Sequence, residues 1–193
     1  CGNTTMSLAC AQSAYDYVLI YIQERKQFGK PIIDFQAVQI QLAEMKMKLD
    51  ASRLLLYRAV VNADKSLPSI AESSIAKCFA NEIAREVTGK CVQLMGGYGY
   101  STEYPIEQKM RDAWGWGIAG GSIDIQKTNI SIENCISETN STGYRGVRKA
   151  KNKFSAIFQK KYLGTFDTPQ EAALEYAYEE IKKKELNKLE RDI

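Results

Sequence analysis

Apolar residues recur at alternating steps of three and four positions over much of the first 95 residues, and this period constrains the fold more than any other feature. Such spacing places apolar side chains on one face of an α-helix. Three stretches show it, at Leu8, Ala11, Tyr15, Val18 and Ile22; at Phe35, Val38, Leu42, Met45, Leu49, Leu56 and Ala59; and at Ala76, Phe79, Ile83, Val87, Cys91 and Leu94. Amphipathic helices with short connections predict an antiparallel bundle.

The third stripe has recognisable ends. Ser69 precedes Glu72 by three positions, which is the pattern of a capping box at a helix N-terminus. Gly96 and Gly97 follow the stripe, and glycines at this place are typical of a helix end. The sequence therefore predicts a helix that begins after Ser69 and ends before Gly96.

The period changes to two in the last third of the chain. Phe154, Ala156 and Phe158 alternate with polar residues, as in a strand with one buried face. Short β-type runs cover residues 144–148 and 162–166, and Thr168 followed by Pro169 predicts the start of a charged helix that continues into the tail. We therefore expect a mainly α fold: an antiparallel helical bundle, then a small α+β module with a three-stranded antiparallel sheet and one helix.

Charge separates within this second part. Residues 145–161 carry seven positive charges and no acid, whereas residues 167–180 carry five acids and no base. This separation predicts two faces with different partners. The polar residues 137–143 are typical of a linker, so we expect domains at 1–130 and 143–193, joined by a linker at 131–142.

Composition excludes several functions. The chain has no histidine, which excludes histidine-dependent nucleophilic catalysis and zinc sites that need imidazole; we expect no metal site. Its five cysteines are odd in number and lack CxxC spacing, so we expect free thiols in the cytoplasm. No apolar run approaches the roughly 18 residues of a membrane span. Because the chain starts at Cys1 and not at Met, we expect a fragment or a processed product.

Three ordered motifs carry a family resemblance. They read ERKQFGKPIIDFQ from Glu24, CVQLMGGYGYSTEYP from Cys91 and RDAWGWGIAGGSIDIQ from Arg111. Together, over about residues 2–130, they resemble the C-terminal helical domain of acyl-CoA dehydrogenases. The resemblance implies a four-helix bundle, FAD as cofactor, an acyl-CoA substrate and a homo-oligomer, a dimer or tetramer that forms through the bundle.

The resemblance also implies cofactor-binding residues. Arg25 and Phe28 match positions that contact the diphosphate and adenine of FAD, and a forked, permanently charged guanidinium suits a diphosphate. Gln36 matches a glutamine of the same site, and Ser122 and Asp124 match a flavin-contacting stretch. Gln93, Gly96 and Gly97 match the loop that closes over the cofactor from a partner subunit. For Arg25 alone, a surface ion pair with Glu24 or Asp16 is the alternative. For Gly96 and Gly97, the alternative is a simple helix stop.

The reaction of this family needs a carboxylate base, and here the chain departs from the pattern. Many members place a glutamate directly before a Gly-Thr or Gly-Ser pair, but that position is Gly120. Other branches carry the base at a site that would precede Cys1. We therefore expect no catalytic residue within this chain and no turnover by the chain alone. Trp114 and Trp116 fall near the implied acyl pocket, with core packing as the alternative.

The segment GYRGVRKAKNKFSAIFQKKYLGTFDTPQEAALEYA, from Gly143, resembles the APETALA-type or ethylene-response-factor (ERF) DNA-binding domain. The resemblance implies a sheet that binds the major groove of double-stranded DNA. Its contact positions match Arg145, Arg148, Lys160, Tyr162, Thr165 and Tyr176. Ile157 and Gln159 stand where members often have a charged pair, so base specificity does not transfer. The alternative is a solvated basic edge that prevents strand aggregation.

Two functions thus remain open. The first is the C-terminal part of an FAD-dependent acyl-CoA dehydrogenase with an appended DNA-binding module. The second is a DNA-binding, transcription-factor-like protein that uses an inactive dehydrogenase-derived bundle as a scaffold. An accidental joining of two reading frames is a third reading.

Overall fold

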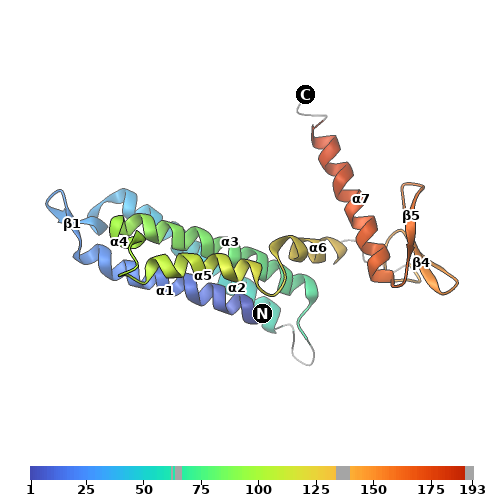
Figure 1. The fold of residues 1–193 in the computed structure, drawn as a ribbon, viewed down its shortest axis with the longest axis horizontal. Helices are drawn as coiled ribbons and strands as arrows, with labels where there is room; N and C mark the ends of the chain where they lie inside the picture. Colours follow the sequence, from blue (N-terminus) through green and yellow to red (C-terminus); the bar gives the residue numbers. More distant parts are fainter. Residues whose placement is uncertain (62, 64–66, 134–139, 190–193) are drawn as a thin grey trace. The chain divides into compact units, whose positions relative to one another are not determined.

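The computed structural model describes residues 1–61, 63, 67–133 and 140–189, and the chain divides into two compact units at residues 1–127 and 128–193 (Figure 1). The elements of the first unit are α1 (Gly2–Glu24), β1 (Lys26–Gln27), β2 (Lys30–Pro31), the 3-10 turn η1 (Ile32–Asp34), α2 (Gln36–Val61), α3 (Ile70–Met95), α4 (Gly97–Tyr100) and α5 (Ile106–Ile118). α6 (Ile123–Glu133) crosses the boundary between the units.

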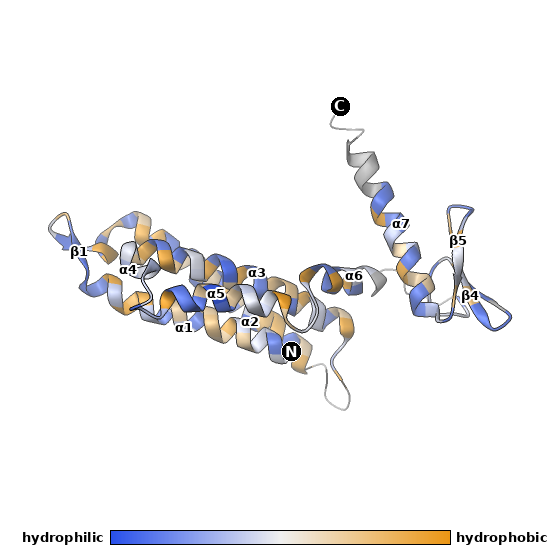
Figure 2. Ribbon diagram, in the orientation of Figure 1, coloured by the Kyte–Doolittle hydropathy of each residue, from blue (hydrophilic) through white to orange (hydrophobic). Residues whose placement is uncertain are grey.

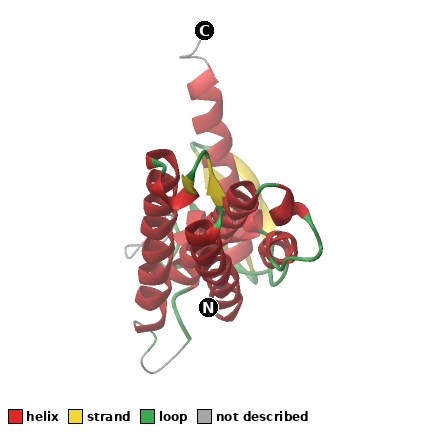
Figure 3. Cartoon of the chain, turned by 90° about the vertical axis from the view of Figure 1, so that its left-hand side faces the viewer, coloured by secondary structure: helices red, strands yellow, loops and turns green. Residues whose placement is uncertain are grey.

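The four long helices of the first unit form an up-down-up-down bundle, which confirms the predicted fold (Figures 1 and 3). α3 contacts α1, α2 and α5. Orange and blue residues alternate along the bundle helices in Figure 2, as amphipathic helices require. The core takes side chains from all four helices, among them Val18, Ile22, Met45, Leu49, Val87, Cys91 and Ala113, and it contains most members of the three predicted stripes.

α3 begins and ends where the sequence predicts. The Ser69 hydroxyl accepts a hydrogen bond from the backbone N–H of Glu72 at 3.4 Å, a cap that contributes about 1 kcal/mol. The helix ends at Gly96, whose φ of +60° lies in the left-handed region that glycine adopts without strain.

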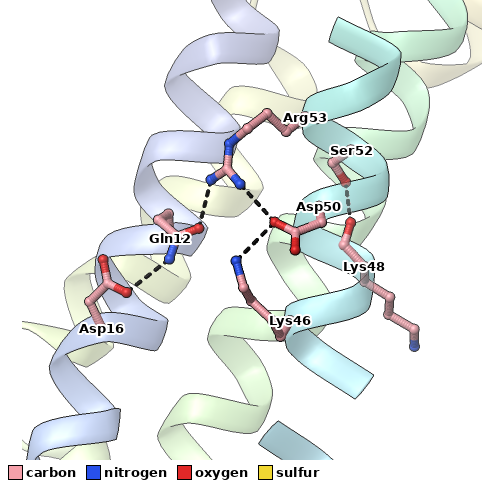
Figure 4. A network of polar contacts seen from close by, with 7 residues as sticks. All are labelled: Gln12, Asp16, Lys46, Lys48, Asp50, Ser52 and Arg53. Carbon is pink, nitrogen blue, oxygen red and sulfur yellow. Dashed lines mark hydrogen bonds and ion pairs between the residues drawn. The ribbon is translucent and has the colours of Figure 1, made fainter. Parts of the chain in front are cut away.

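Polar contacts also join the helices at the bundle surface (Figure 4). The Arg53 guanidinium on α2 donates to the Gln12 side chain on α1 at 2.8 Å and to Asp50 on its own helix at 2.8 Å. Lys46 donates to the same Asp50 carboxylate, and Gln12 donates to Asp16. The network therefore fixes the rotamer of Arg53 between α1 and α2 while leaving the core apolar.

The second unit is a small α+β module, as predicted. Its elements are β3 (Val147–Ala150), β4 (Lys153–Phe158), β5 (Lys161–Phe166) and α7 (Pro169–Leu189), and the strands form an antiparallel sheet in the order β3-β4-β5. α7 packs on the sheet, and its residues Ala172 and Ala173 form the core with Val147 and Ala156. Thr168 and Glu171 cap α7 reciprocally through their side chains and backbone N–H groups.

The first strand of the sheet starts later than the sequence indicated. β3 begins at Val147 and not at Tyr144, because Gly146 has a φ of +68° and turns the chain. A Cβ at this glycine would lie 2.3 Å from the ring of Tyr176 on α7. Residues 145–146 of the expected strand thus form a turn that lies close to α7.

The predicted linker falls partly outside the described residues. Residues 134–139, which include Cys135, are not described, and α6 continues through residues 131–133. The assignment of 1–130 and 143–193 as functional domains stays a prediction. Cys1, Cys10, Cys78 and Cys91 are free thiols. None of the helices in the described ranges combines the length and the apolar character that a bilayer crossing needs.

Candidate functional site

A pocket of about 590 Å³ lies where the C-terminal ends of α1 and α3 come together. Arg25, Gln93, Gly96 and Gly97 all line it, although Arg25 is far from the other three in sequence. The up-down topology of the bundle brings the last turns of α1 and α3 to the same end, which explains their meeting. Four of the eight predicted cofactor residues thus share one pocket.

Arg25 is exposed and points a free charge toward this pocket. It follows the last residue of α1 in extended conformation, and its guanidinium lies 5.8 Å from the centre of the Tyr98 ring. None of the described carboxylates forms an ion pair with it: Asp16, the alternative partner, accepts from Gln12 instead. A cation over an aromatic face keeps its donors available to an anion.

Tyrosines form the wall beneath Arg25. Tyr98 packs edge-on against Tyr21, with ring centres 6.3 Å apart, and it contacts Tyr104 with a tilted ring at 5.2 Å. Burial raises the pKa of Tyr21, so its hydroxyl stays neutral. The charged side chains in the lining are Arg25 and Glu103.

The glycine pair leaves open space. A Cβ built on Gly96 or on Gly97 would meet no atom within 4 Å. Gly96 needs its positive φ to end α3, which agrees with the helix-stop alternative. Gly97 has neither a positive φ nor a close neighbour, so the fold alone does not account for a glycine there.

Phe28 and Gln36 lie outside the lining of the pocket. Phe28 is at the β1–β2 turn, 93% exposed and with a φ of +51°, and its ring contacts Phe35 edge-on at 6.2 Å. The neighbouring Gln27 does line the pocket. Gln36 is the exposed first residue of α2. Both roles stay predictions.

Ser122 and Asp124 lie away from this pocket. Ser122 is the last residue of the loop between α5 and α6 (residues 119–122, called the α5–α6 loop), and Asp124 is in the first turn of α6. The Ser122 hydroxyl accepts a hydrogen bond from the backbone N–H of Ile125 at 3.4 Å and so caps α6. In the same loop Gly120 has a φ of +66°, and a Cβ there would lie 3.7 Å from the Lys77 Nζ and 3.8 Å from the Asn3 Nδ2.

The two tryptophans have different surroundings. Trp114 is half-exposed, and its ring lies 4.2 Å from the Arg85 guanidinium. Trp116 lines a pocket of about 360 Å³ together with Arg111 and Asp112.

In the second unit, three predicted DNA contacts share the outer face of the sheet. The register pairs Arg148 with Ser155 and Ser155 with Thr165, and it pairs Ile157 with Tyr162. Residues that pair across antiparallel strands lie on the same face, opposite the face that packs on α7. The Tyr162 and Thr165 hydroxyls also hydrogen-bond each other.

The other three predicted DNA contacts are placed differently. Arg145 is exposed in the turn before β3, and Lys160 is exposed in the β4–β5 turn with a φ of +71°. Tyr176 lies on the inner side, where its ring contacts Phe158 at 5.2 Å and fills the space above Gly146. This packing accounts for Tyr176 without DNA.

Sequence reasoning missed Tyr21, Tyr98, Asn3 and Lys77. Tyr21 lies one helical turn before Arg25, and Tyr98 directly follows the glycine pair, so both positions carried a local signal. Lys77 and Asn3 carried none, because their partners are carbonyls of a loop more than forty residues away.

Fold and pocket together define a helical-bundle domain with an open pocket at one end of the bundle. A family model described as the C-terminal domain of acyl-CoA dehydrogenase matches residues 2–133. The chain therefore belongs to the acyl-CoA dehydrogenase family. The match ends at residue 133, close to the start of the second unit.

Known relatives agree with this assignment. The short/branched chain specific acyl-CoA dehydrogenase of Bos taurus mitochondria is 43% identical over 136 residues, which are 70% of this chain and 31% of the relative. The caffeyl-CoA reductase-Etf complex subunit CarC of Acetobacterium woodii is 42% identical over 67% of this chain and 34% of its own length. The chain thus spans about a third of the length of these relatives.

Solved structures share the fold. Butyryl-CoA dehydrogenase from Megasphaera elsdenii superposes with a TM-score of 0.65 and 38% identity, over 67% of this chain and 34% of that chain. A glutaryl-coenzyme A dehydrogenase in complex with glutaryl-CoA gives a TM-score of 0.65 and 35% identity, over 68% of this chain and 34% of that chain.

Proposed function

We propose that this chain forms the C-terminal part of an FAD-dependent acyl-CoA dehydrogenase, which removes hydrogen from the α and β carbons of an acyl-CoA thioester. The observation that carries the proposal is the convergence of Arg25, Gln93 and the glycine pair on one pocket. These residues are far apart in the sequence and meet only in the folded chain.

The residues of this pocket fit a dinucleotide diphosphate. Arg25 offers a forked cation that no described carboxylate neutralises, and the Gln93 amide adds hydrogen-bonding groups. Gly97 has no side chain where the fold would allow one, which lets an external group approach the backbone closely. Arg25, Gln93, Gly96 and Gly97 would therefore hold the diphosphate of FAD, with Phe28 beside the adenine.

The chemistry divides between cofactor and protein. When bound, the flavin accepts the hydride that leaves the β carbon, while a carboxylate must take the α proton. Gly120 cannot supply that carboxylate. Asn3 in the first turn of α1 donates to the carbonyl of Ala119 at 3.1 Å, so the start of α1 lies beside the loop that holds Gly120. The 193-residue chain alone is thus not expected to oxidise an acyl-CoA.

Self-association is part of this proposal. Exposed apolar residues recur every seventh position along α2, at Ile40, Met47, Leu54 and Val61. With the neighbouring Val60, these side chains are 49% to 73% exposed. An apolar stripe at this spacing is typical of a helix that packs against another helix. Sedimentation equilibrium should show a dimer or tetramer, and Leu54→Glu should shift it to monomer. A native chain that sediments as a monomer at all concentrations would contradict this part.

Nucleotide titration tests the cofactor site. The purified chain is titrated with FAD, ADP and riboflavin, with fluorescence for the flavins and calorimetry for ADP. FAD and ADP should bind saturably and riboflavin should not, because it lacks the diphosphate. Arg25→Ala should weaken both by about tenfold, the worth of one charge-assisted contact. Lys26→Ala, at the adjacent exposed position outside the pocket lining, is the matched control. Riboflavin binding as tight as FAD, or no effect of Arg25→Ala, would refute the assignment.

A second function is favoured by the outer face of the sheet in the second unit. Arg148, Tyr162 and Thr165 share that face, while the acidic side chains follow α7 on the other side. Cations and hydroxyls on one face suit phosphates and base edges of double-stranded DNA. We propose that this unit is a DNA-binding module of the ERF type.

Salt dependence tests the DNA module. Affinity for a random duplex is measured by anisotropy at several salt concentrations, and each phosphate contact should add about −0.9 to the slope of log K against log salt. Arg148→Ala should flatten the slope by about one such step. Lys153→Ala is the control, since Lys153 pairs with Asp167. No binding at low salt would refute the module. DNA binding without FAD or ADP binding would favour the alternative of an inactive bundle used as a scaffold.

A further inference from the structure

Lys77 makes an unusual set of contacts inside the bundle. It lies on α3, is 5% exposed, and its ammonium donates to three successive carbonyls, those of Ala119 at 2.6 Å, Gly120 at 2.8 Å and Gly121 at 2.5 Å. A lysine ammonium has three N–H donors, so every donor is used. None of the described carboxylates forms an ion pair with Lys77, and burial lowers its pKa.

The geometry of the α5–α6 loop explains why a cation is needed there. Gly120 and Gly121 both have positive φ, at +66° and +91°. The loop thereby turns three carbonyl oxygens toward one point, where they would repel one another without a donor. One compact ammonium satisfies all three carbonyls with hydrogen bonds. Arginine, with its planar fork, does not match this arrangement.

The same face of α3 holds the rest of the loop. Ser74 donates to the Gln126 side chain at 3.0 Å, and the Cys78 thiol contacts the carbonyl of Ile123 at 3.7 Å. One turn later Asn81 donates to Asn3, which itself donates to Ala119. These α3 residues are spaced three, four and seven positions apart, so they form one polar row along the helix. Lys77 is the charged member at its centre.

We propose that Lys77 is a positioning residue: its ammonium fixes the α5–α6 loop and thereby sets where Ser122 and Asp124 stand at the start of α6. The relevance of those two residues to flavin rests on the proposed function, whereas the fixing of the loop does not. A side chain at position 120 would also emerge 3.7 Å from the Lys77 Nζ. Lys77 therefore holds the backbone at Gly120, the position where many members of the resembled family carry the catalytic base.

Hydrogen exchange on the full chain tests the positioning without any flavin. Three amides report on the loop and its ends: Ala119, which bonds to Gly115, and Ile125 and Gln126, which bond to Ser122. In Lys77→Met these amides should exchange at least about tenfold faster, while those of residues 42–56 in α2 change little. Lys90→Met is the matched control, because Lys90 lies on the same helix but pairs with Glu44 and Glu86.

Chemical rescue separates charge and donors from mere packing. In Lys77→Ala, added propylammonium should restore slow exchange of the three amides, whereas tetramethylammonium, which has no N–H donor, should not. If Lys77→Met does not fold, Lys77→Gln is measured in the same way. Unchanged exchange at the loop in the folded variant, or equal rescue by both cations, would overturn the proposal.

A flavin readout distinguishes this proposal from the proposed function. ADP affinity of Lys77→Met should equal that of the native chain, because the pocket around Arg25 is at the other end of α3, but the visible spectrum of bound FAD should differ. If the native chain binds neither ligand, the proposed function fails and the exchange result still decides the role of Lys77. If bound FAD has the same spectrum in both proteins, the link from the loop to flavin is wrong.

Discussion

The buried hydrogen bond between Ser7 on α1 and Asn81 on α3 allows a quantitative prediction of how removing either partner changes the stability of the first unit. Both residues are fully buried, and the Ser7 hydroxyl donates to the Asn81 Oδ1 at 2.6 Å. Asn81 in turn donates to the carbonyl of Lys77 at 2.7 Å. No other partner of the Ser7 hydroxyl occurs among the described contacts, so replacing Asn81 by leucine leaves that hydroxyl unsatisfied in a dry core.

The magnitudes follow from the asymmetry of buried hydrogen bonds. Each lost bond costs about 1 kcal/mol, and a stranded buried hydroxyl costs a further 1–3 kcal/mol or so. Asn81→Leu removes three such bonds, with Ser7, with the carbonyl of Lys77 and with Asn3, so it should destabilise the first unit by about 4–6 kcal/mol. Ser7→Ala should cost about 1–2 kcal/mol in the native chain. In the Asn81→Leu background the same change removes the stranded hydroxyl, so it should cost nothing or stabilise slightly.

Urea unfolding followed by tryptophan fluorescence measures this cycle. Both tryptophans, Trp114 and Trp116, lie in α5, so the signal reports on the first unit alone. Ser52→Ala is the control, because the buried Ser52 hydroxyl donates only to Lys48 within α2; its cost should be the same in both backgrounds. Equal costs of Ser7→Ala in the two backgrounds, within about 0.5 kcal/mol, would refute the reasoning.

Three further predictions concern other parts of the molecule. Burial raises the pKa of the Cys91 thiol to about 12. Iodoacetamide near pH 8 should therefore leave Cys91 unmodified in the native chain while it labels Cys1, which is only partly buried. Equal labelling of the two cysteines by mass spectrometry would contradict this. Gly146→Ala should destabilise the second unit by about 2 kcal/mol or more, because the alanine would have a strained positive φ and would clash with Tyr176. Gly143→Ala has a similar φ but open space around it, so it should show the cost of the strain alone. Circular dichroism and hydrogen exchange of the β3–β5 amides measure the difference. Hydrogen bonds from Lys48 and then Lys90 lower the pKa of Glu86 below 4.5. This carboxylate therefore stabilises the fold above about pH 4.5, and the stabilisation is lost as pH falls through the lowered pKa. The unfolding midpoint of Glu86→Gln should fall less steeply with acid than that of the native chain, whereas a parallel fall in both proteins would show that the Glu86 ion pairs contribute nothing.

Local patterns predicted those parts of the fold that local interactions determine. Ser69, Glu72 and Gly96 lie within a few residues of the helix ends that they fix, so the bounds of α3 were readable from the sequence. The start of β3 was not, because Gly146 turns the chain under Tyr176, which belongs to a helix thirty residues later.

The candidate site shows the same division. Periodicity identified α1, which Arg25 directly follows, and α3, which carries Gln93. Only the family resemblance placed both residues in one site, because an apolar stripe does not show which helix ends lie next to each other. Lys77 was not recognised at all. It falls between Ala76 and Cys78 in an apolar stretch, where a lysine reads as the polar face of a helix, and its three acceptors are backbone atoms that no side-chain motif reveals.

α3 connects the two places that the proposed function uses, and its length explains why one copy of the chain is not expected to suffice. Lys77 and Gln93 are both on this helix, and at 1.5 Å per residue they stand about 24 Å apart along its axis. The pocket around Arg25 and the loop that carries Ser122 therefore lie at well-separated levels of the same bundle. If Arg25 and Gln93 hold the diphosphate of FAD, the flavin end of that FAD reaches the α5–α6 loop of the same chain only when the dinucleotide runs extended along α3. Otherwise a different chain must contact the flavin. Two copies that associate through α2 would instead let the pocket of one copy and the loop of the other serve a single cofactor. The monomeric Leu54→Glu variant should accordingly keep its affinity for ADP and bind FAD more weakly than the native chain does.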